Sequence, residues 1–252
     1  MKFGILGPLQ VIGDDLALIP IRQARQRALL AVLLLHHGQP VPTRRLAGML
    51  WGSDQPRGVP EALRTHVWAV RRQLAPALRL LTTAAGYRLD IQPGELDLDE
   101  FRQLSQRAEE ALRAGQSAGA VGLLGRALRL WREPPPGDIP ATPAMAGAVR
   151  QLTQEWQAAR ETLIEARFAL GQRRQLIPGL WAEVAAHPER ERLIKLLMLS
   201  LYGCDRRAEA LDVYRRSQTT LARRYGISLG PALQRLHQQM LADDPALSLA
   251  TG

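Results

Sequence analysis

The chain of 252 residues contains a single cysteine, Cys204, and this scarcity excludes whole classes of site. One cysteine cannot form an intrachain disulfide or a cysteine-cluster metal site. Cys204 follows Tyr202 and Gly203 at the end of an expected helix. We therefore expect it to be buried as a small hydrophobic residue rather than to act as a nucleophile.

Long hydrophobic runs are also missing. The longest, Ala28 to Leu35, is much shorter than the ~20 apolar residues of a membrane-spanning helix. The N-terminal segment is broken by Gly4, Gly7 and Pro8, so it does not read as the apolar helix of a signal peptide. These absences predict a soluble, cytoplasmic protein without a membrane partner.

The motifs of common enzymes and cofactor sites are not found either. The sequence has no GxxxxGK(S/T) phosphate loop, no HExxH metal motif, and no constellation of serine, histidine and aspartate suited to catalysis. His36 and His37 are adjacent, and adjacent side chains on a helix point apart, so a shared metal ion is not expected. We expect no enzymatic activity, no cofactor and no metal site.

Positive charge is in excess, with a net charge of +9, and it is unevenly distributed. Residues 1–95 hold 12 basic and 6 acidic side chains, a net +6, whereas the longer remainder holds 21 and 18, a net +3. Such a concentration of positive charge fits nucleic acid as a partner. With 46% apolar and 23% charged residues, the chain should be globular, and its length suggests two domains.

One predicted helix, from Pro60 to Ala75, carries the strongest functional signal. Pro60 suits a first helical turn, where its missing N–H costs nothing. Apolar residues at steps of four, three and four predict a single buried stripe: Leu63, Val67, Val70 and Leu74. The opposite side, without an acidic residue after Glu61, consists of Arg64, Thr65, Trp68, Arg71 and Arg72. This face fits a helix in the DNA major groove, although a basic face can also be merely solvated.

Short strand-like segments open the chain. Alternating apolar residues over 3–11 and 16–21, separated by a turn at 13–15, predict a small antiparallel sheet. A largely apolar helix over 23–37 follows and should be buried on all sides. A second helix should begin with Thr43 as its N-cap.

The remaining segments complete a recognisable order. A loop over 52–59 leads to the Pro60 helix, and two strand-like runs meeting near residues 84–86 predict a hairpin after it. Strands, two helices, a loop, a basic helix and a hairpin make up a winged helix-turn-helix with an N-terminal sheet. Residues 1–95 are therefore expected to form an α+β DNA-binding domain.

Residues 96–252 are predicted to form an all-α domain, which makes the protein mainly α. Asp97 should cap the first helix, in a pattern close to a capping box. The proline-rich segment 133–140 should be extended, either as a spacer or as a loop wrapped on the surface. Helices ending at Gly171 and Gly203 lie 32 residues apart, near the tetratricopeptide period of about 34, which predicts tetratricopeptide-like stacking of helical hairpins.

The residues of the first part also resemble a known family. The motifs are Arg25-Gln-Arg-Ala-Leu-Leu-Ala, Arg45-Leu-Ala-Gly-Met-Leu-Trp-Gly, Leu63 to Leu74, and Gly86-Tyr-Arg-Leu. Together they are similar to the OmpR-type DNA-binding domain of the Streptomyces antibiotic regulatory proteins (SARPs). The resemblance implies that the Pro60 helix is the recognition helix and the hairpin is the wing.

The resemblance also implies contacts outside the recognition helix. Family wings carry an arginine that enters the minor groove, but Thr83-Ala84 stands there in this chain. The wing would then rely on Arg88 or on backbone groups, while Arg44 and Arg45 are candidate phosphate contacts. Trp68 either packs on the hairpin or touches a thymine methyl group or a sugar.

The second part resembles the bacterial transcriptional activation domain of the same family. The matching segments are Ala127–Arg132, His187–Leu193, Leu197–Tyr202, Ala208–Tyr214 and Gly226–Ala232. The resemblance implies a transcriptional activator of secondary-metabolite genes that binds tandem direct repeats in double-stranded promoter DNA near the −35 element. A second copy would bind beside the first, and Asp54, Gln55 and Arg57 would help to recruit RNA polymerase holoenzyme through its sigma factor and other subunits.

A second interpretation remains open. Stacked helical hairpins also fit a protein-interaction scaffold or a ligand sensor, in which the basic N-terminal domain binds protein rather than DNA. The net +6 of residues 1–95 favours DNA.

Overall fold

The structure is a computed structural model and describes residues 1–134, 137–244 and 247. These residues form two compact units: Met1–Arg107 with Leu123–Ala159, and Ala108–Gly122 with Arg160–Gly252. Three helices contribute residues to both units, so the units do not follow the order of the sequence. The predicted boundary between domains 1–95 and 96–252 differs from the boundaries of these units, and the two domains stay a prediction.

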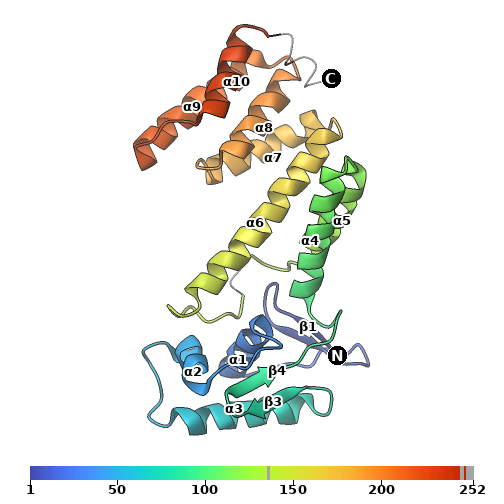
Figure 1. The fold of residues 1–252 in the computed structure, drawn as a ribbon, viewed down its shortest axis with the longest axis vertical. Helices are drawn as coiled ribbons and strands as arrows, with labels where there is room; N and C mark the ends of the chain where they lie inside the picture. The colour runs from blue at the N-terminus through green and yellow to red at the C-terminus, as the bar shows by residue number, and fades with distance from the viewer. Residues whose placement is uncertain (135–136, 245–246, 248–252) are drawn as a thin grey trace. The chain divides into compact units, whose positions relative to one another are not determined.

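A small sheet, three helices and a hairpin begin the first unit (Figure 1). Strand β1 (Lys2–Gly4) pairs antiparallel with β2 (Gln10–Ile12). The next elements are α1 (Ala24–Leu35), α2 (Thr43–Trp51), α3 (Val59–Leu74), β3 (Leu80–Thr83) and β4 (Gly86–Leu89). β3 and β4 are antiparallel, with Leu80 opposite Leu89. Three helices followed by a hairpin is the order that the sequence predicts.

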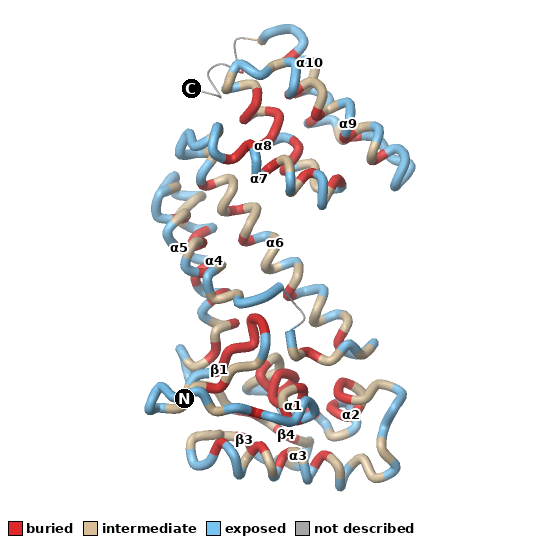
Figure 2. The backbone as a smooth tube through the Cα atoms, turned by 180° about the vertical axis from the view of Figure 1, so that it is seen from behind, coloured by how far each residue is buried: buried red, intermediate tan, exposed pale blue. Residues whose placement is uncertain are grey.

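Helix α1 forms the centre of this unit. Every residue from Ala28 to Leu34 is buried, and α2 and α3 both pack against the helix (Figure 2). Full burial of each leucine stabilises the fold by about 1.5–3 kcal/mol. The prediction of a buried scaffold helix is thus confirmed for residues 28–34, while Ala24 and Arg25 in the first turn are exposed.

The apolar stripe of α3 faces this core. Leu63, Val67, Val70 and Leu74 are all buried, as their spacing predicts. In Figure 1, α3 runs along one edge of the unit, with the hairpin beside it. Because the stripe anchors one side of α3, the opposite side is directed to solvent.

The hairpin is held to the helices by a short backbone pairing at Val41. Val41 N donates to Tyr87 O over 2.8 Å, and Tyr87 N donates to Val41 O over 3.0 Å. Gly86 has a φ of +139°, and a Cβ there would lie 2.1 Å from the Val41 carbonyl oxygen. Only glycine lets the hairpin approach this closely.

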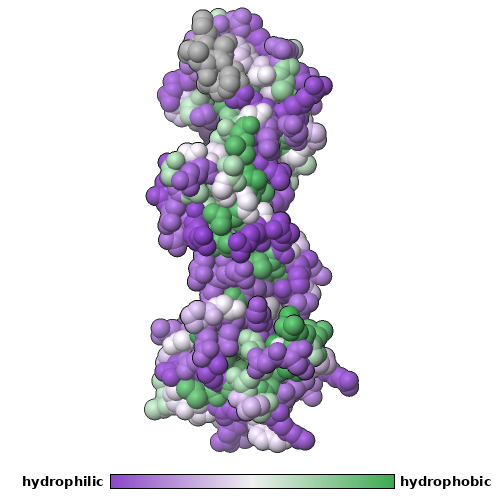
Figure 3. Space-filling view, turned by 90° about the vertical axis from the view of Figure 1, so that its right-hand side faces the viewer, coloured by the Kyte–Doolittle hydropathy of each residue, from purple (hydrophilic) through white to green (hydrophobic). Residues whose placement is uncertain are grey.

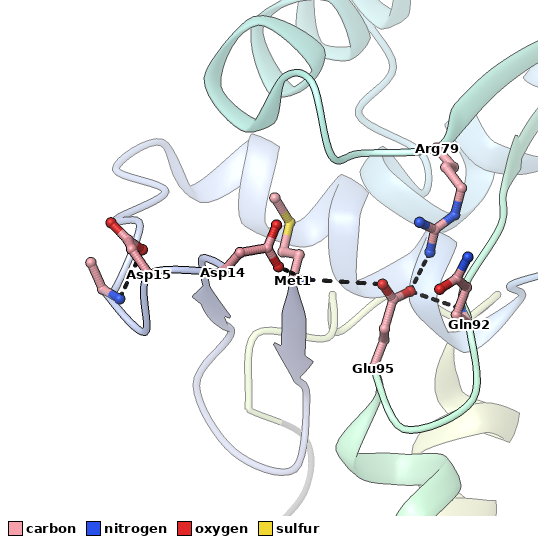
Figure 4. A network of polar contacts seen from close by, with 7 residues as sticks. Met1, Asp14, Asp15, Arg79, Gln92 and Glu95 are labelled. Carbon is pink, nitrogen blue, oxygen red and sulfur yellow. Dashed lines mark hydrogen bonds and ion pairs between the residues drawn. The ribbon is translucent and has the colours of Figure 1, made fainter.

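A polar network closes the base of the hairpin (Figure 4). The Glu95 carboxylate accepts hydrogen bonds from Arg79, which precedes β3, and from Gln92 N at 2.7 Å. Asp90 N also donates to Arg79 O over 3.0 Å. The N-terminal amino group of Met1 pairs with Asp14 beside this network. Both ends of the hairpin are therefore fixed to the segment before the next helix.

Two local predictions for the N-terminal region are wrong. The expected return strand over 16–21 is reduced to one bridge between Ile12 and Leu18. Leu16 has a φ of +63° and is 82% exposed, since Asp15 Oδ1 instead accepts a hydrogen bond from Ala17 N in a tight turn. Thr43 is already the first residue of α2 and makes no side-chain cap.

Asp97 is not the helix cap that its pattern predicts. It lies in the first turn of α4 (Asp97–Arg113), and its carboxylate accepts hydrogen bonds from Ile5 N at 2.9 Å and Leu6 N at 3.1 Å. Arg132 Nη1 also donates to it over 3.1 Å. Burial raises the pKa of Asp97 against the lowering effect of these hydrogen bonds. The acid thus joins α4 to the N-terminal sheet.

The remaining helices are α5 (Ser117–Arg129), α6 (Ala146–Ala169), α7 (Arg173–Ala186), α8 (Glu191–Tyr202), α9 (Arg207–Tyr225) and α10 (Pro231–Leu241). In the first unit, Phe101 meets Trp131 edge to face at 5.3 Å, and Trp156 lies 6.3 Å from Trp131. None of the described helices combines the length and apolar character needed to cross a membrane.

Helix α8 is the core of the second unit. Its residues Leu193, Ile194, Leu197, Met198 and Leu201 are almost fully buried, and α7, α9 and α10 pack against it (Figure 2). Residues 193–201 thus form a central, largely apolar helix. The chain is mostly helical, as expected.

The described part of the proline-rich segment is wrapped on the first unit. The two carboxylate oxygens of Asp138 accept from Leu9 N at 2.8 Å and Arg27 Nε at 3.0 Å. A few residues further on, Thr142 Oγ1 donates to Met49 O over 2.9 Å. Of the two predicted roles, these contacts support a surface loop, while residues 135–136 lie outside the described part.

Candidate nucleic-acid interface

The face of α3 opposite the buried stripe gathers most of the predicted DNA contacts. Arg64, Thr65, Trp68 and Arg72 are exposed there, and Arg71 is partly exposed. The only carboxylate on this face belongs to Glu61, in the first turn of the helix. The face therefore presents cations, a hydroxyl group and an indole to solvent.

Trp68 and Arg72 form a pair one helical turn apart. The guanidinium carbon of Arg72 lies 5.2 Å from the centre of the Trp68 ring, within cation–π range. Trp68 remains 59% exposed. The exposed indole thus supports an arginine in the last turn of α3.

Arg64 and Thr65 are bonded to the first turn of their own helix. Arg64 Nη2 lies 2.7 Å from Glu61 Oε1, with both side chains about two-thirds exposed. Exposed pairs of this kind contribute little to stability, so Arg64 can leave Glu61 and pair with another anion at little cost. Thr65 Oγ1 donates to Glu61 O over 3.0 Å, and the residue remains exposed.

Arg71 is directed to the hairpin instead. Its Nε donates to Leu80 O over 2.9 Å, and its Nη2 donates to Thr82 Oγ1 over 3.0 Å. These contacts lie across β3 and fix the hairpin against the C-terminal half of α3. Arg71 thus sits in the predicted face, but its hydrogen bonds are directed into the fold.

The hairpin itself presents few free cations. Arg88 pairs with Asp90, with a closest approach of 2.9 Å, and both are partly exposed. Thr83 Oγ1 donates to Gly86 O over 3.1 Å and stabilises the turn. Ala84 and Ala85 at the tip are exposed. Thr83 and Arg88 were predicted to contact DNA from the wing. In the structure, the Thr83 hydroxyl is bonded within the turn and the Arg88 guanidinium is paired with Asp90.

Arg44 and Arg45 lie in the first turn of α2 and are exposed. Neither has a hydrogen bond or ion pair with any residue that the structure describes. Cations in a first helical turn are unfavourable to the helix dipole, and no acidic residue of that turn offsets them. Their placement does not stabilise α2, but it suits contact with an external anion.

The loop between α2 and α3 holds Asp54, Gln55 and Arg57, all exposed. Gln55 Nε2 donates to Gly52 O over 3.1 Å, and Ser53 Oγ donates to Asp54 Oδ1 over 3.2 Å. Arg57 makes no polar contact with the described residues. These side chains form a mixed-charge surface beside the N-terminus of α3.

His66 belongs to the underside of this face and was not among the predicted site residues. Its ring lies 6.2 Å from that of Trp51, at the contact between α2 and α3. Burial and then the nearby Arg25 charge lower the pKa of His66, so it stays neutral at pH 7. In the sequence, its position directly before Val67 of the buried stripe was the feature that could have indicated partial burial. In the described residues, no three His, Cys, Asp or Glu side chains group to hold a metal ion.

Comparison with known proteins gives these features a context. A family model described as the bacterial transcriptional activator domain matches residues 96–241. Regulatory protein AfsR of Streptomyces coelicolor is 38% identical over 98% of this chain, which spans only 25% of that protein. Transcriptional regulator RedD of the same organism is 35% identical over 99% of this chain and 73% of its own length.

A solved structure matches as well. Mycobacterium tuberculosis EmbR, in complex with a low affinity phosphopeptide, superposes with a TM-score of 0.89 at 31% identity. The alignment covers 99% of this chain and 68% of that chain. From the family match and these relatives, the chain belongs to the SARP family of transcriptional regulators with a bacterial transcriptional activator domain.

Proposed function

We propose that the chain is a sequence-specific, DNA-binding transcriptional activator. In this proposal α1, α2, α3 and the β3–β4 hairpin act as a winged helix-turn-helix, and α3 lies in the major groove. The observation that carries it is the exposed face of α3, which presents Arg64, Trp68 and Arg72 opposite a fully buried stripe.

The side chains divide by role. Arg64 and Arg72 have the geometry for guanine edges, and Thr65 and Trp68 suit a thymine methyl group or a sugar. Arg44 and Arg45 suit phosphates, because they have no described partner inside the fold. Arg88 would have to release Asp90 before it could serve the same purpose.

The relatives extend the proposal beyond DNA. AfsR, RedD and EmbR are named as regulatory proteins or transcriptional regulators. We propose that two copies bind side by side on tandem direct repeats and recruit RNA polymerase, with Asp54, Gln55 and Arg57 as contacts. The regulated genes would belong to a secondary-metabolite cluster, and the chain would carry no enzymatic activity of its own.

A gel-shift and footprinting experiment on promoter DNA beside the gene tests the central point. The double variant Arg64→Gln/Arg72→Gln should lose specific binding. A matched control, Arg223→Gln/Arg224→Gln, removes two exposed cations of α9 and should bind as the wild type does. The slope of log K against log salt should become shallower by about 0.9 for each phosphate that a variant no longer neutralises.

Two results would contradict the proposal. If the α3 and α9 variants weaken binding equally, the interaction is general electrostatics. If the wild type binds no promoter fragment but captures a protein through its first unit, the protein-scaffold interpretation takes its place.

A further inference from the structure

The second unit contains a cavity of about 330 Å³ between α7 and α9. This volume is at the lower end of the range of small-molecule sites, about 300–1,000 Å³. Trp181 and Val184 of α7, Pro188, and Val213 of α9 give it apolar walls. Val184, Pro188 and Val213 are buried, and Trp181 is partly exposed. The walls thus combine a firm aliphatic floor with one planar aromatic side.

A serine whose hydroxyl has no partner among the described residues lines this cavity. Ser217 is 5% exposed, and its hydroxyl makes no hydrogen bond to any described residue. The two threonines of α9 behave differently: Thr219 donates to Arg215 O at 3.0 Å and Thr220 to Arg216 O at 2.8 Å. The Ser217 hydroxyl is not one of the described side-chain atoms that are sealed from solvent without a partner, so it is reachable from the cavity and can bond to a ligand placed there.

The edge of the cavity carries positive charge. Arg216 lines it and is 72% exposed, and its Nε lies 2.5 Å from Asp212 Oδ2. Arg215 approaches the same carboxylate to 3.9 Å. Two arginines around one aspartate leave a net charge of +1, and the remaining Arg216 N–H groups are free to donate to an anion.

We propose that this cavity binds a small planar aromatic acid. The ring would lie against Trp181 and the aliphatic walls, a polar atom would reach Ser217, and the carboxylate would pair with Arg216. The site belongs to α7 and α9 of the second unit and shares no residue with the α3 face, so the proposal goes beyond DNA recognition and does not depend on it.

Ligand-detected nuclear magnetic resonance on the full chain tests this assignment with two probes of the same shape. Naphthalene-2-carboxylate should bind saturably with a Kd below about 1 mM, and neutral naphthalene-2-carboxamide about tenfold more weakly. Arg216→Gln should remove this preference for the acid. Ser217→Ala should weaken both probes, and Ser217→Leu should fill the cavity and abolish binding without lowering Tm. Arg223→Gln, an exposed cation of the same helix, should bind as the wild type does.

The contrary results are equally specific. If neither probe saturates the wild type, the cavity does not bind this class of ligand. Unchanged binding to Ser217→Ala and Ser217→Leu would place the probes elsewhere on the protein. Equal affinity of Arg216→Gln for the acid would show that the positive edge plays no part.

Discussion

Arg71 Nε donates to the carbonyl oxygen of Leu80 over 2.9 Å, and this bond couples the helix proposed to read DNA to the hairpin beside it. Nη2 also donates to Thr82 Oγ1, so the edge of the guanidinium group formed by Nε and Nη2 is directed to the hairpin. We therefore treat Arg71 as a positioning residue rather than as a contact to bases.

The first prediction follows from this contact. Arg71→Ala should destabilise the fold by about 1–3 kcal/mol, because the Leu80 carbonyl loses its donor. Protection of DNA on the hairpin side of the footprint should disappear, while the base preference of the remaining site is kept. Arg72→Ala is the control, with an unchanged Tm but altered base preference. If Arg71→Ala instead leaves Tm unchanged and alters the base preference, Arg71 is a contact to bases.

The second prediction concerns Trp68 and Arg72. Trp68→Ala should weaken binding and relax the preference at one base pair next to the one read by Arg72, at a cost of about 1–3 kcal/mol. Trp68→Phe should restore part of this loss because it keeps an aromatic face under the guanidinium. Systematic single-base substitution in the operator provides the measurement. A loss spread evenly over all sequences would assign Trp68 to backbone contact alone.

The third prediction concerns two copies on DNA. If they lie on one face of the duplex, insertion of half a helical turn, about 5 base pairs, between direct repeats should abolish activation. Each repeat alone should still bind weakly in a gel shift. Insertion of a full turn of about 10–10.5 base pairs is the matched control and should restore transcript. Activation that ignores the spacing would argue against side-by-side binding.

The fourth prediction is a pH dependence at His66. Its pKa is lowered in the folded state, so below the ordinary value of 6.5 the unfolded chain takes up a proton before the folded one does. Stability should therefore fall as the pH drops from about 7 toward 5. His66→Gln should lose less stability over this interval in denaturant titrations. A wild-type loss no greater than that of the variant would show that His66 is not the responsible group.

The fifth prediction compares two leucines of the first unit. Leu30→Ala should cost about 2–5 kcal/mol, because it opens a cavity in the fully buried centre of α1. Leu16→Ala removes a side chain that is 82% exposed and should change stability by no more than about 0.5 kcal/mol. Urea unfolding of both variants gives the comparison. Similar losses would mean that the turn at Leu16 is part of the core.

The sequence predicts periodic features well. The stripe of α3 and the burial of α1 and α8 follow from spacing and composition alone, because a helix converts sequence interval directly into direction. The hairpin was also predictable, since two short apolar runs are separated by small residues around Gly86. The exposed residues of α3 were also predictable, because they lie on the side of the helix opposite the buried stripe.

Long-range polar partners were not predictable in this way. Asp97 has the local pattern of a cap, yet its acceptors are taken by Ile5 and Leu6, more than 90 positions earlier. Arg71 fits a DNA-facing helix by spacing, and only the path of β3 shows that its Nε and Nη2 donate to the hairpin. The strand expected over 16–21 failed for a local reason, because the Asp15 side chain competes for the backbone.

On the face of the chain drawn in Figure 3, hydrophilic residues predominate and hydrophobic ones form separate patches. Surfaces of this kind give few apolar clues to a partner. For this reason, charge placement and unpaired polar groups carry the functional argument more than hydrophobicity does.

The loop after α5, which packs on the first unit, also determines how short an N-terminal fragment can be without losing contacts of the N-terminal sheet. Asp97, Arg132 and Asp138 supply partners to the backbone of residues 5–9, and Thr142 reaches α2. A protease fragment ending at residue 95 would leave the N–H groups of Ile5, Leu6 and Leu9 without these acceptors. An N-terminal fragment that retains these acceptors has to reach Asp138, and one that also keeps the bond from Thr142 to α2 has to reach Thr142, well beyond the end of β4.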